Sequence, residues 1–213
     1  MINKLSKGYE RFRRGYYQSN KARLQQLSKK QEPQIAIVSC CDSRVDPGLL
    51  FDVKPGELFV IRNVANLVPP FETEGEYHGT SAALEFAVNY LKVKQIVVLG
   101  HANCGGIKSL MEDESVPKSD SFIDNWMQLA AAAKEYVLAR NDACTHQQKI
   151  TACEKKSVNY SLRNLMTYPW IRDKLVTGNI SLLGLYYDLN NGELAILDEI
   201  TTVECSKESS TTQ

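Results

Sequence analysis

The sequence predicts an α/β protein whose mostly parallel central sheet carries an antiparallel edge strand, is flanked by helices and is preceded by an N-terminal helical arm. Short β-branched runs alternate with helical periodicity along the chain, which is typical of strand–helix–strand units with right-handed crossovers. Near the end, Asn190-Asn191-Gly192 separates two apolar runs and predicts a hairpin. With 213 residues, the chain is long enough for a sizeable core.

The N-terminal region is basic and amphipathic. Aromatic and leucine side chains recur at roughly helical spacing between Leu5 and Lys29, which predicts one or two helices. Their apolar side can pack on the chain's own core or on a second subunit. We expect a helical arm over residues 1–30 and a flexible polar tail over residues 206–213, on a single domain spanning residues 1–213.

The remaining elements follow from hydrophobic spacing. Short β-branched runs predict three buried strands, which are Ile35–Val38, Leu58–Ile61 and Ile96–Leu99. Apolar residues at helical spacing predict three helices, which are Thr80–Lys92, Ser121–Arg140 and Val158–Leu175. The two strands of the hairpin are expected over Ile180–Asp188 and Glu193–Leu197.

The bulk composition excludes several classes of protein. Hydrophobic residues make up 43% and charged residues 23% of the chain, near the averages for soluble globular proteins. Basic and acidic residues number 25 each, so the chain has no global attraction for nucleic acid or for an acidic membrane. No apolar run reaches the length of a membrane-spanning helix, and the N-terminus lacks the apolar stretch of a secretory signal. We therefore expect a cytoplasmic protein with neither nucleic-acid nor membrane partners.

Two of the predicted strands end in residues that bind metals. Cys40 follows the first strand, and His101 and Cys104 follow the third. Sites in open parallel sheets form beyond the carboxyl ends of the strands, so these side chains converge if the two strands are neighbours. Two thiolates and an imidazole suit tetrahedral Zn²⁺, and three protein ligands leave a fourth position for water, as in catalytic zinc sites. The sequence therefore predicts a zinc site with one ion per chain.

Asp42 and Arg44 share the turn with Cys40. A carboxylate beside a guanidinium stays ionised and oriented. Asp42 can orient a zinc-bound hydroxide toward a substrate, or it can bind zinc as a conditional fourth ligand and shut the site. Arg44 would decide between the two states by holding Asp42, and an ordinary structural ion pair is the alternative. Since thiolates make zinc a weaker Lewis acid than imidazoles do, we expect an activity that rises toward alkaline pH.

These residues resemble a known pair of motifs. Residues 40–44, Cys-Cys-Asp-Ser-Arg, and residues 101–104, His-Ala-Asn-Cys, are similar to the Cys-x-Asp-x-Arg and His-x-x-Cys signature of β-class carbonic anhydrases. The likeness covers about residues 31–110 and extends more weakly to residue 197. It implies reversible hydration of carbon dioxide to bicarbonate and a proton, by attack of zinc-bound hydroxide. By this resemblance the zinc ligands are Cys40, His101 and Cys104, and the catalytic dyad is Asp42 and Arg44.

The resemblance also implies a substrate pocket of the plant-like, always-open group. The residues that match this pocket are Gln31, Phe59, Val64, Phe86 and the backbone amide of Gly105. Phe86 stands where the plant-like pocket has a tyrosine, so one hydroxyl is missing. The group regulated by bicarbonate carries a tryptophan three residues before the first cysteine, where this chain has Ile37. Arg62, which matches the bicarbonate arginine of that group, is common to both groups.

The family forms dimers by wrapping N-terminal helices over a partner, so the resemblance implies a homodimer or a dimer of dimers. The pocket then lies at the subunit interface, and some lining residues can come from the other chain. Three rival functions stay open. They are a zinc hydrolase acting on carbon disulfide or carbonyl sulfide, a non-catalytic zinc-stabilised scaffold, and a redox protein using Cys40 and Cys41, although adjacent cysteines form a strained disulfide.

Overall fold

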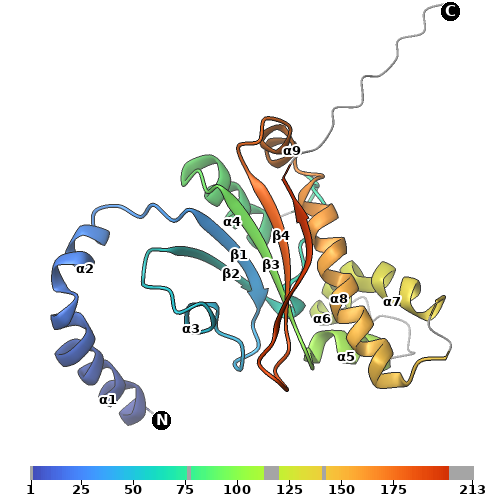
Figure 1. The fold of residues 1–213 in the computed structure, drawn as a ribbon, viewed down its shortest axis with the longest axis horizontal. Helices are drawn as coiled ribbons and strands as arrows, with labels where there is room; N and C mark the ends of the chain where they lie inside the picture. The colour runs from blue at the N-terminus through green and yellow to red at the C-terminus, as the bar shows by residue number, and fades with distance from the viewer. Residues whose placement is uncertain (1, 76–77, 113–119, 141–142, 202–213) are drawn as a thin grey trace, which may run out of the picture.

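A five-stranded sheet with helices packed against it forms the body of the protein (Figure 1). The computed structural model describes residues 2–75, 78–112, 120–140 and 143–201, so the expected tail over residues 206–213 lies outside the described residues. The strand order is β2-β1-β3-β4-β5, with β5 antiparallel to β4 and every other pair parallel. The predicted α/β class, with a mostly parallel sheet and an antiparallel edge, is confirmed.

The strands contain the three predicted buried runs, and the two predicted hairpin strands are present with slightly different ends. They are β1 (Ile35–Cys40), β2 (Leu58–Asn63), β3 (Gln95–His101), β4 (Ser181–Tyr187) and β5 (Leu194–Ile200). Strand β1 lies in parallel between β2 and β3, and Ser39 pairs with Leu99. Because parallel neighbours point the same way, β1 and β3 deliver Cys40 and His101 to one edge of the sheet.

The α-helices are α1 (Ile2–Phe12), α2 (Lys21–Leu27), α3 (Pro47–Leu50), α4 (Gly79–Glu85), α5 (Gly105–Glu112), α6 (Phe122–Met127), α7 (Ala131–Leu138), α8 (His146–Leu165) and α9 (Pro169–Val176). Shorter π- and 3₁₀-helical segments join some of them, at η1 (Arg13–Tyr17), η2 (Val64–Asn66), η3 (Phe86–Tyr90) and η4 (Gln128–Ala130). The expected helix over Ser121–Arg140 is divided into α6, η4 and α7.

The prediction of one helix over Val158–Leu175 was wrong at its start and in its continuity. Helix α8 begins at His146, where Thr145 and Gln148 form a capping box with reciprocal side-chain bonds. It ends at Leu165, and Pro169 opens the separate helix α9, because proline suits the first turn of a helix and not its interior.

Helix α8 lies close against β3 and β4 because both strands carry a glycine beneath it. A Cβ atom on Gly100 would lie 2.6 Å from Cγ2 of Val158, and one on Gly184 would lie 2.9 Å from Cδ1 of Leu162. Val158 and Leu162 belong to the larger core cluster, which fills the space between this face of the sheet and α4, α8 and α9. The two glycines therefore set the distance between helix and sheet.

The N-terminal helices stand apart from this core. None of the residues of α1, η1 or α2 is buried, and Figure 1 shows these helices projecting from the body of the chain. The arm is joined to the body by the ion pair between Arg23 and Glu57, 2.8 Å apart, and by contact of Leu27 with the region of Gly56. In the described part of the chain, no helix combines the length and the apolar character that crossing a membrane requires.

The close approach of α8 predicts that a single methyl group on β3 destabilises the fold. Gly100→Ala should lower the free energy of unfolding by about 1–3 kcal/mol, because Val158 or the whole helix must move. Urea denaturation monitored by circular dichroism measures the change. Gly79→Ala is the control, since no described heavy atom lies within 4 Å of its added Cβ, and it should be neutral or slightly stabilising. Equal effects of the two substitutions would contradict the packing argument.

Candidate metal centre

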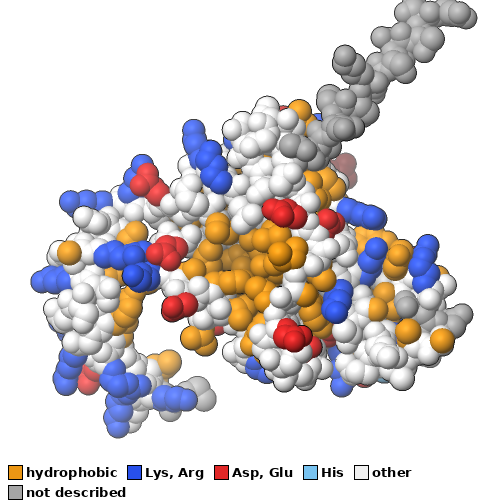
Figure 2. Space-filling model, viewed as in Figure 1, with side chains coloured by type: hydrophobic (Ala, Val, Ile, Leu, Met, Phe, Trp, Pro, Cys, Tyr) orange, Lys and Arg blue, Asp and Glu red, His pale blue; other side chains and the backbone are white. Residues whose placement is uncertain are grey.

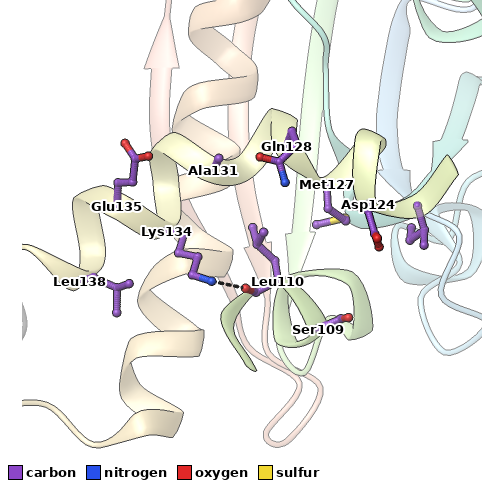
Figure 3. A pocket seen from close by; sticks show the side chains of 10 residues that line it. Ser109, Leu110, Asp124, Met127, Gln128, Ala131, Lys134, Glu135 and Leu138 are labelled. Carbon is purple, nitrogen blue, oxygen red and sulfur yellow. Dashed lines mark hydrogen bonds between the residues drawn. The ribbon is translucent and has the colours of Figure 1, made fainter. Parts of the chain in front are cut away.

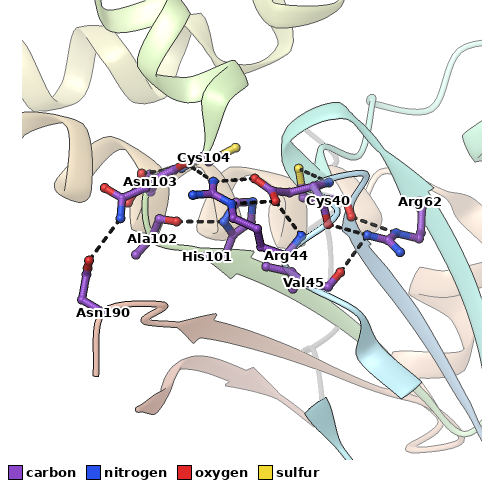
Figure 4. Close-up of polar contacts among 11 residues, drawn as sticks. Cys40, Arg44, Val45, Arg62, His101, Ala102, Asn103, Cys104 and Asn190 are labelled. Carbon is purple, nitrogen blue, oxygen red and sulfur yellow. Dashed lines mark hydrogen bonds and ion pairs between the residues drawn. The ribbon is translucent and has the colours of Figure 1, made fainter. Parts of the chain in front are cut away.

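Cys40, His101 and Cys104 meet at the carboxyl edge of the sheet (Figure 4). Their two sulfur atoms and one imidazole nitrogen all lie within 4.8 Å of one another, and all three residues are buried. Cys40 ends β1, His101 ends β3, and Cys104 immediately precedes α5. The convergence that the sequence predicted from the two strand ends is confirmed.

The imidazole of His101 is oriented for a metal. Its Nδ1 atom lies 2.9 Å from the carbonyl oxygen of Ala102, and because a carbonyl only accepts, Nδ1 must carry the proton. In the neutral ring, Nε2 then presents a lone pair, and this buried atom has no hydrogen-bond partner among the described residues. An unpartnered buried nitrogen is costly, and a metal ion at this position would satisfy it.

The two thiols share one proton in the absence of a cation. A hydrogen bond from Cys104, against the opposing effect of burial, lowers the pKa of Cys40 to about 4, and contact with His101 adds to this. The same contact raises the pKa of Cys104 far above its usual range, since a second thiolate would lie beside the first in a buried site. A divalent cation removes that repulsion, and two thiolates with an imidazole are a donor set that Zn²⁺ prefers. The residues present therefore fit zinc.

The side chain of Asp42 is held by Arg44, while its backbone N–H donates to Sγ of Cys40 at 3.4 Å. Arg44 donates from Nε to Oδ1 at 2.9 Å and from Nη2 to Oδ2 at 2.7 Å, and its backbone N–H donates to Oδ1 at 2.9 Å. These bonds hold the pKa of the Asp42 carboxyl well below its usual range. The predicted pairing of the two side chains is present, and both oxygens of the carboxylate are turned toward the guanidinium.

Arg62 fixes the turn that carries this pair. Its Nε donates to the carbonyl oxygen of Cys40 at 2.9 Å, and Nη2 donates to those of Asp42 at 2.8 Å and Val45 at 2.7 Å. The guanidinium thus binds three carbonyl groups of one turn (Figure 4). Sequence reasoning noted Arg62 but did not identify this clamp, because nothing in the sequence reveals which carbonyl groups an arginine on a neighbouring strand will reach.

Of the five predicted pocket residues, two lie next to the metal cluster. Gly105 follows Cys104 and opens α5. Val64 follows β2 in η2, and its Cγ1 atom is 2.9 Å from the position that a Cβ on Gly106 would take. These two residues share the carboxyl edge of the sheet with the ligands.

The other three predicted pocket residues lie elsewhere in this chain. Phe59 pairs with Ala36, four residues before Cys40 and therefore about 13 Å away along the strand. Phe86 packs against Phe59 with ring centroids 6.0 Å apart. Gln31 precedes β1 at the opposite edge of the sheet, in a hollow that residues of α2 also line. The fold of one chain does not bring these three side chains to the metal ligands.

A second hollow lies between α5, α6 and α7 (Figure 3). Its lining includes Leu110, Met127, Ala131 and Lys134, and Lys134 donates to the carbonyl oxygen of Leu110 at 2.8 Å. None of the three clustered ligands lines it.

One buried acid near the site was missed from the sequence. Glu154 lies on α8, and its Oε1 atom accepts the backbone N–H of Cys104 at 2.9 Å. Burial raises the pKa of its carboxyl against the opposing effect of its hydrogen bonds. Its spacing to the buried Ile150 and Val158, four residues on either side, is the signal that could have revealed an acid on the buried face of a helix.

Comparison with known proteins agrees with this geometry. The carbonic anhydrase family matches residues 35–194. Beta carbonic anhydrase 3 of Arabidopsis thaliana is 37% identical over 205 residues, which cover 94% of this chain and 79% of that relative. The solved structure of the β-carbonic anhydrase CcaA is similar with a TM-score of 0.86 and 33% identity, over 95% of this chain and 92% of that one.

A structure reported for two tetrameric β-carbonic anhydrases of Sordaria macrospora is similar with a TM-score of 0.82 and 26% identity, over 92% of this chain and 96% of that one. The family match covers the three clustered side chains and the strands β1 to β4. The chain therefore belongs to the β class of the carbonic anhydrase family, and it is a zinc enzyme that hydrates carbon dioxide reversibly to bicarbonate.

Proposed function

We propose that this carbonic anhydrase is of the plant-like, always-open type, with Asp42 and Arg44 as its catalytic dyad and a pocket completed by a second subunit. The always-open type is supported by the two hydrogen bonds that the Arg44 side chain donates to the Asp42 carboxylate. These bonds keep the carboxylate away from the cluster of three metal ligands. In a shut site, Asp42 would have to give up both bonds to Arg44 in order to bind the metal.

The chemistry follows from the groups around the cluster. When held by Cys40, His101 and Cys104, Zn²⁺ lowers the pKa of a bound water and so supplies a nucleophile near neutral pH. Asp42 accepts a hydrogen bond from the attacking water and aims it at the carbon of carbon dioxide. The Gly105 amide lies at the N-terminus of α5, where it would donate to a substrate oxygen and stabilise the negative charge that develops there.

The lowered pKa of Asp42 excludes this residue as the group whose titration makes the activity rise toward alkaline pH. Its folded-state pKa is depressed by Arg44, so the stabilisation from this pair is fully present above the ordinary carboxyl pKa of about 3.9. It is lost only as the pH falls through the lower folded value. Asp42 therefore stays ionised near neutral and alkaline pH, and a rise of activity in that range does not come from its titration.

Two further observations favour the open type. Arg62 already donates to three backbone carbonyl groups and forms an ion pair with Asp46 at 3.7 Å, so its donors are engaged in the turn. Ile37, which replaces the tryptophan of the regulated group, is buried in an apolar cluster on β1. Neither residue offers bicarbonate a ready second site in this arrangement.

We propose a pocket shared between two subunits because the predicted pocket residues lie in two separate places within one chain. Val64 and Gly105 lie by the ligands, whereas Gln31, Phe59 and Phe86 do not. Phe86 is 42% exposed, and the ring of Tyr90, 70% exposed, stacks on it with centroids 5.4 Å apart. Exposed aromatic clusters of this kind are typical of interfaces between subunits.

Charge and hydropathy favour a second copy of the chain as the partner. The first 30 residues hold nine basic residues and one acidic residue, whereas the remaining chain holds 16 basic and 24 acidic residues. The arm is thus formally +8 and the remaining chain −8. The arm also exposes a row of apolar side chains, which are Ile2, Leu5, Tyr9, Phe12 and Tyr16.

In Figure 2, hydrophobic side chains gather over the middle of the viewed face, beside the basic arm. We propose a homodimer in which each arm covers the partner, or a dimer of such dimers, and the tetrameric relatives of Sordaria macrospora support the larger assembly.

A cytoplasmic location is part of the same proposal. None of the five cysteines among the described residues forms a disulfide with another of them, which suits a reducing compartment. Fractionation of the native cells tests it.

The ligand assignment predicts a loss of activity in Cys104→Ser. Stopped-flow hydration of carbon dioxide should show fast turnover that rises from about pH 6.5 to about pH 9 in the zinc-loaded wild type. Cys104→Ser should lose at least about 100-fold, because the hydroxyl is a poor zinc ligand. Cys41→Ser is the matched control, since this exposed thiol is outside the cluster and should leave the rate unchanged. A Cys104→Ser variant that keeps the wild-type rate would contradict the assignment.

The always-open type predicts no cooperative inhibition by bicarbonate. Initial rates of bicarbonate dehydration should follow a hyperbola at all concentrations, because Asp42 stays on Arg44. Bicarbonate added at acid pH should change the absorption spectrum of the cobalt-substituted wild type no differently from that of cobalt-substituted Asp42→Asn. A sigmoidal rate curve, or a spectral change that Asp42→Asn abolishes, would show that Asp42 moves to the metal and that the site is regulated.

The composite pocket predicts that two inactive variants restore activity to each other. Cys104→Ser breaks the metal half of the site, and Phe59→Asp breaks the aromatic half. After the two proteins are unfolded together and refolded, mixed dimers contain one intact site out of two, so activity should return to about a quarter of the wild-type value. Each variant refolded alone is the control. A mixture as inactive as its components, with dimers present by light scattering, would mean that one chain supplies the whole pocket.

A further inference from the structure

Glu154 is a carboxylate buried in the middle of α8, with 2% of its surface exposed. Oε1 accepts the backbone N–H of Cys104 at 2.9 Å, and Oε2 accepts the hydroxyl of Tyr186 at 2.6 Å. The two oxygens therefore join a metal ligand to a neighbouring strand. A carboxylate is costly to bury, so its place directly behind a ligand calls for a role that an apolar residue could not fill.

The turn that carries Cys104 needs external support. Asn103, just before it, has a φ of 57°, in the left-handed region that non-glycine residues adopt at a cost. Arg44 donates to the carbonyl oxygen of Asn103 at 3.0 Å and holds the turn from one side. The amide of Cys104 stands at the start of α5, where backbone N–H groups have no partner within the helix. Glu154 supplies the acceptor for the Cys104 amide.

We propose that Glu154 is a positioning residue of the metal centre. It fixes the backbone of Cys104 so that the sulfur points at Cys40 and His101, and Tyr186 orients the carboxylate for this bond. The inference rests on Cys104 being a zinc ligand.

The packing of α8 explains how the carboxylate reaches this position. Tyr186 pairs with Gly100 across β4 and β3, and Val158, one helical turn after Glu154, packs on the same glycine. The short distance between α8 and the sheet therefore brings the carboxylate within reach of both partners.

Zinc affinity tests this role directly. Glu154→Ala removes the acceptor, and the Kd for zinc should weaken by about 10–100-fold, as for other residues that support a metal ligand. Tyr186→Phe frees the carboxylate to rotate and should weaken the Kd by about 3–10-fold. Glu154→Gln keeps an oxygen for the Cys104 amide and should stay within about threefold of wild type. Competition with a chromophoric chelator on the folded proteins measures each Kd.

Ser157→Ala is the matched control. Ser157 is buried on the same helix, and its hydroxyl donates to the main-chain oxygen of Glu154 at 2.8 Å without reaching the metal centre. This variant should lose stability toward urea and keep the wild-type Kd for zinc. A merely structural role of Glu154 would give the same pattern in Glu154→Ala, so the two variants separate positioning from packing.

Cobalt substitution provides a second readout, since thiolate-to-cobalt charge-transfer absorption reports the sulfur ligands. The band should weaken or shift in Glu154→Ala and recover in Glu154→Gln. A folded Glu154→Ala with wild-type Kd and cobalt spectrum would overturn the inference. If Glu154→Ala does not fold, a wild-type Kd in Tyr186→Phe overturns it instead. A wild type that binds no zinc would overturn the ligand assignment itself.

Discussion

Two buried sulfur atoms that lie side by side are the constraint around which this structure is arranged. The hydrogen bond from Cys104, with a smaller contribution from His101, lowers the pKa of Cys40, and the same contact raises the pKa of Cys104, so a cation between them is needed to ionise both. The parallel pairing of β1 with β3 creates this contact, because it brings both strand ends to one edge. Two neighbouring thiolates repel each other, and a divalent ion that prefers sulfur ligands removes this repulsion. The arrangement therefore favours such an ion over others.

The groups around the ligands act mostly on backbone atoms. Arg62 binds carbonyl groups of the turn after Cys40, Arg44 binds the carbonyl of Asn103, and Glu154 binds the amide of Cys104. Each long charged side chain thereby fixes main chain, and the ligand side chains follow from it. A metal site held in this way depends on residues far from it in sequence, such as an acid 50 residues beyond its cysteine.

The sequence predicts the structure best where a local pattern of residues shows where a strand or helix ends. The strand ends at Cys40 and His101 could be predicted, because short β-branched runs show where strands stop and parallel topology brings the ends together. The start of α8 could not, because its first turn is polar and only the cap at Thr145 marks it. That error also concealed Glu154, since an acid on a buried helix face is visible only once the helix is known to include it.

The pocket residues show a different limit. Val64 and Gly105 follow directly from elements that end or begin at the metal edge. Gln31, Phe59 and Phe86 cannot be placed by reading one chain, because the register of β2 against β1 sets Phe59 well short of the ligands. In the proposed composite pocket these three residues come from a second subunit, and the motif spacing within one chain does not reveal such a division.

The uneven distribution of charge has a consequence for how copies of the chain approach one another. With a sequence pI near 6.8, the chain has almost no net charge at neutral pH, so distant molecules do not repel. In the proposed dimer, the basic arm of one copy meets a partner whose residues beyond its own arm are acidic in excess. Electrostatic torque then favours encounters in which the arm arrives first, and this steering weakens as salt shortens the Debye length. Ionic strength would therefore act on the rate at which subunits meet more than on the apolar contacts that hold them.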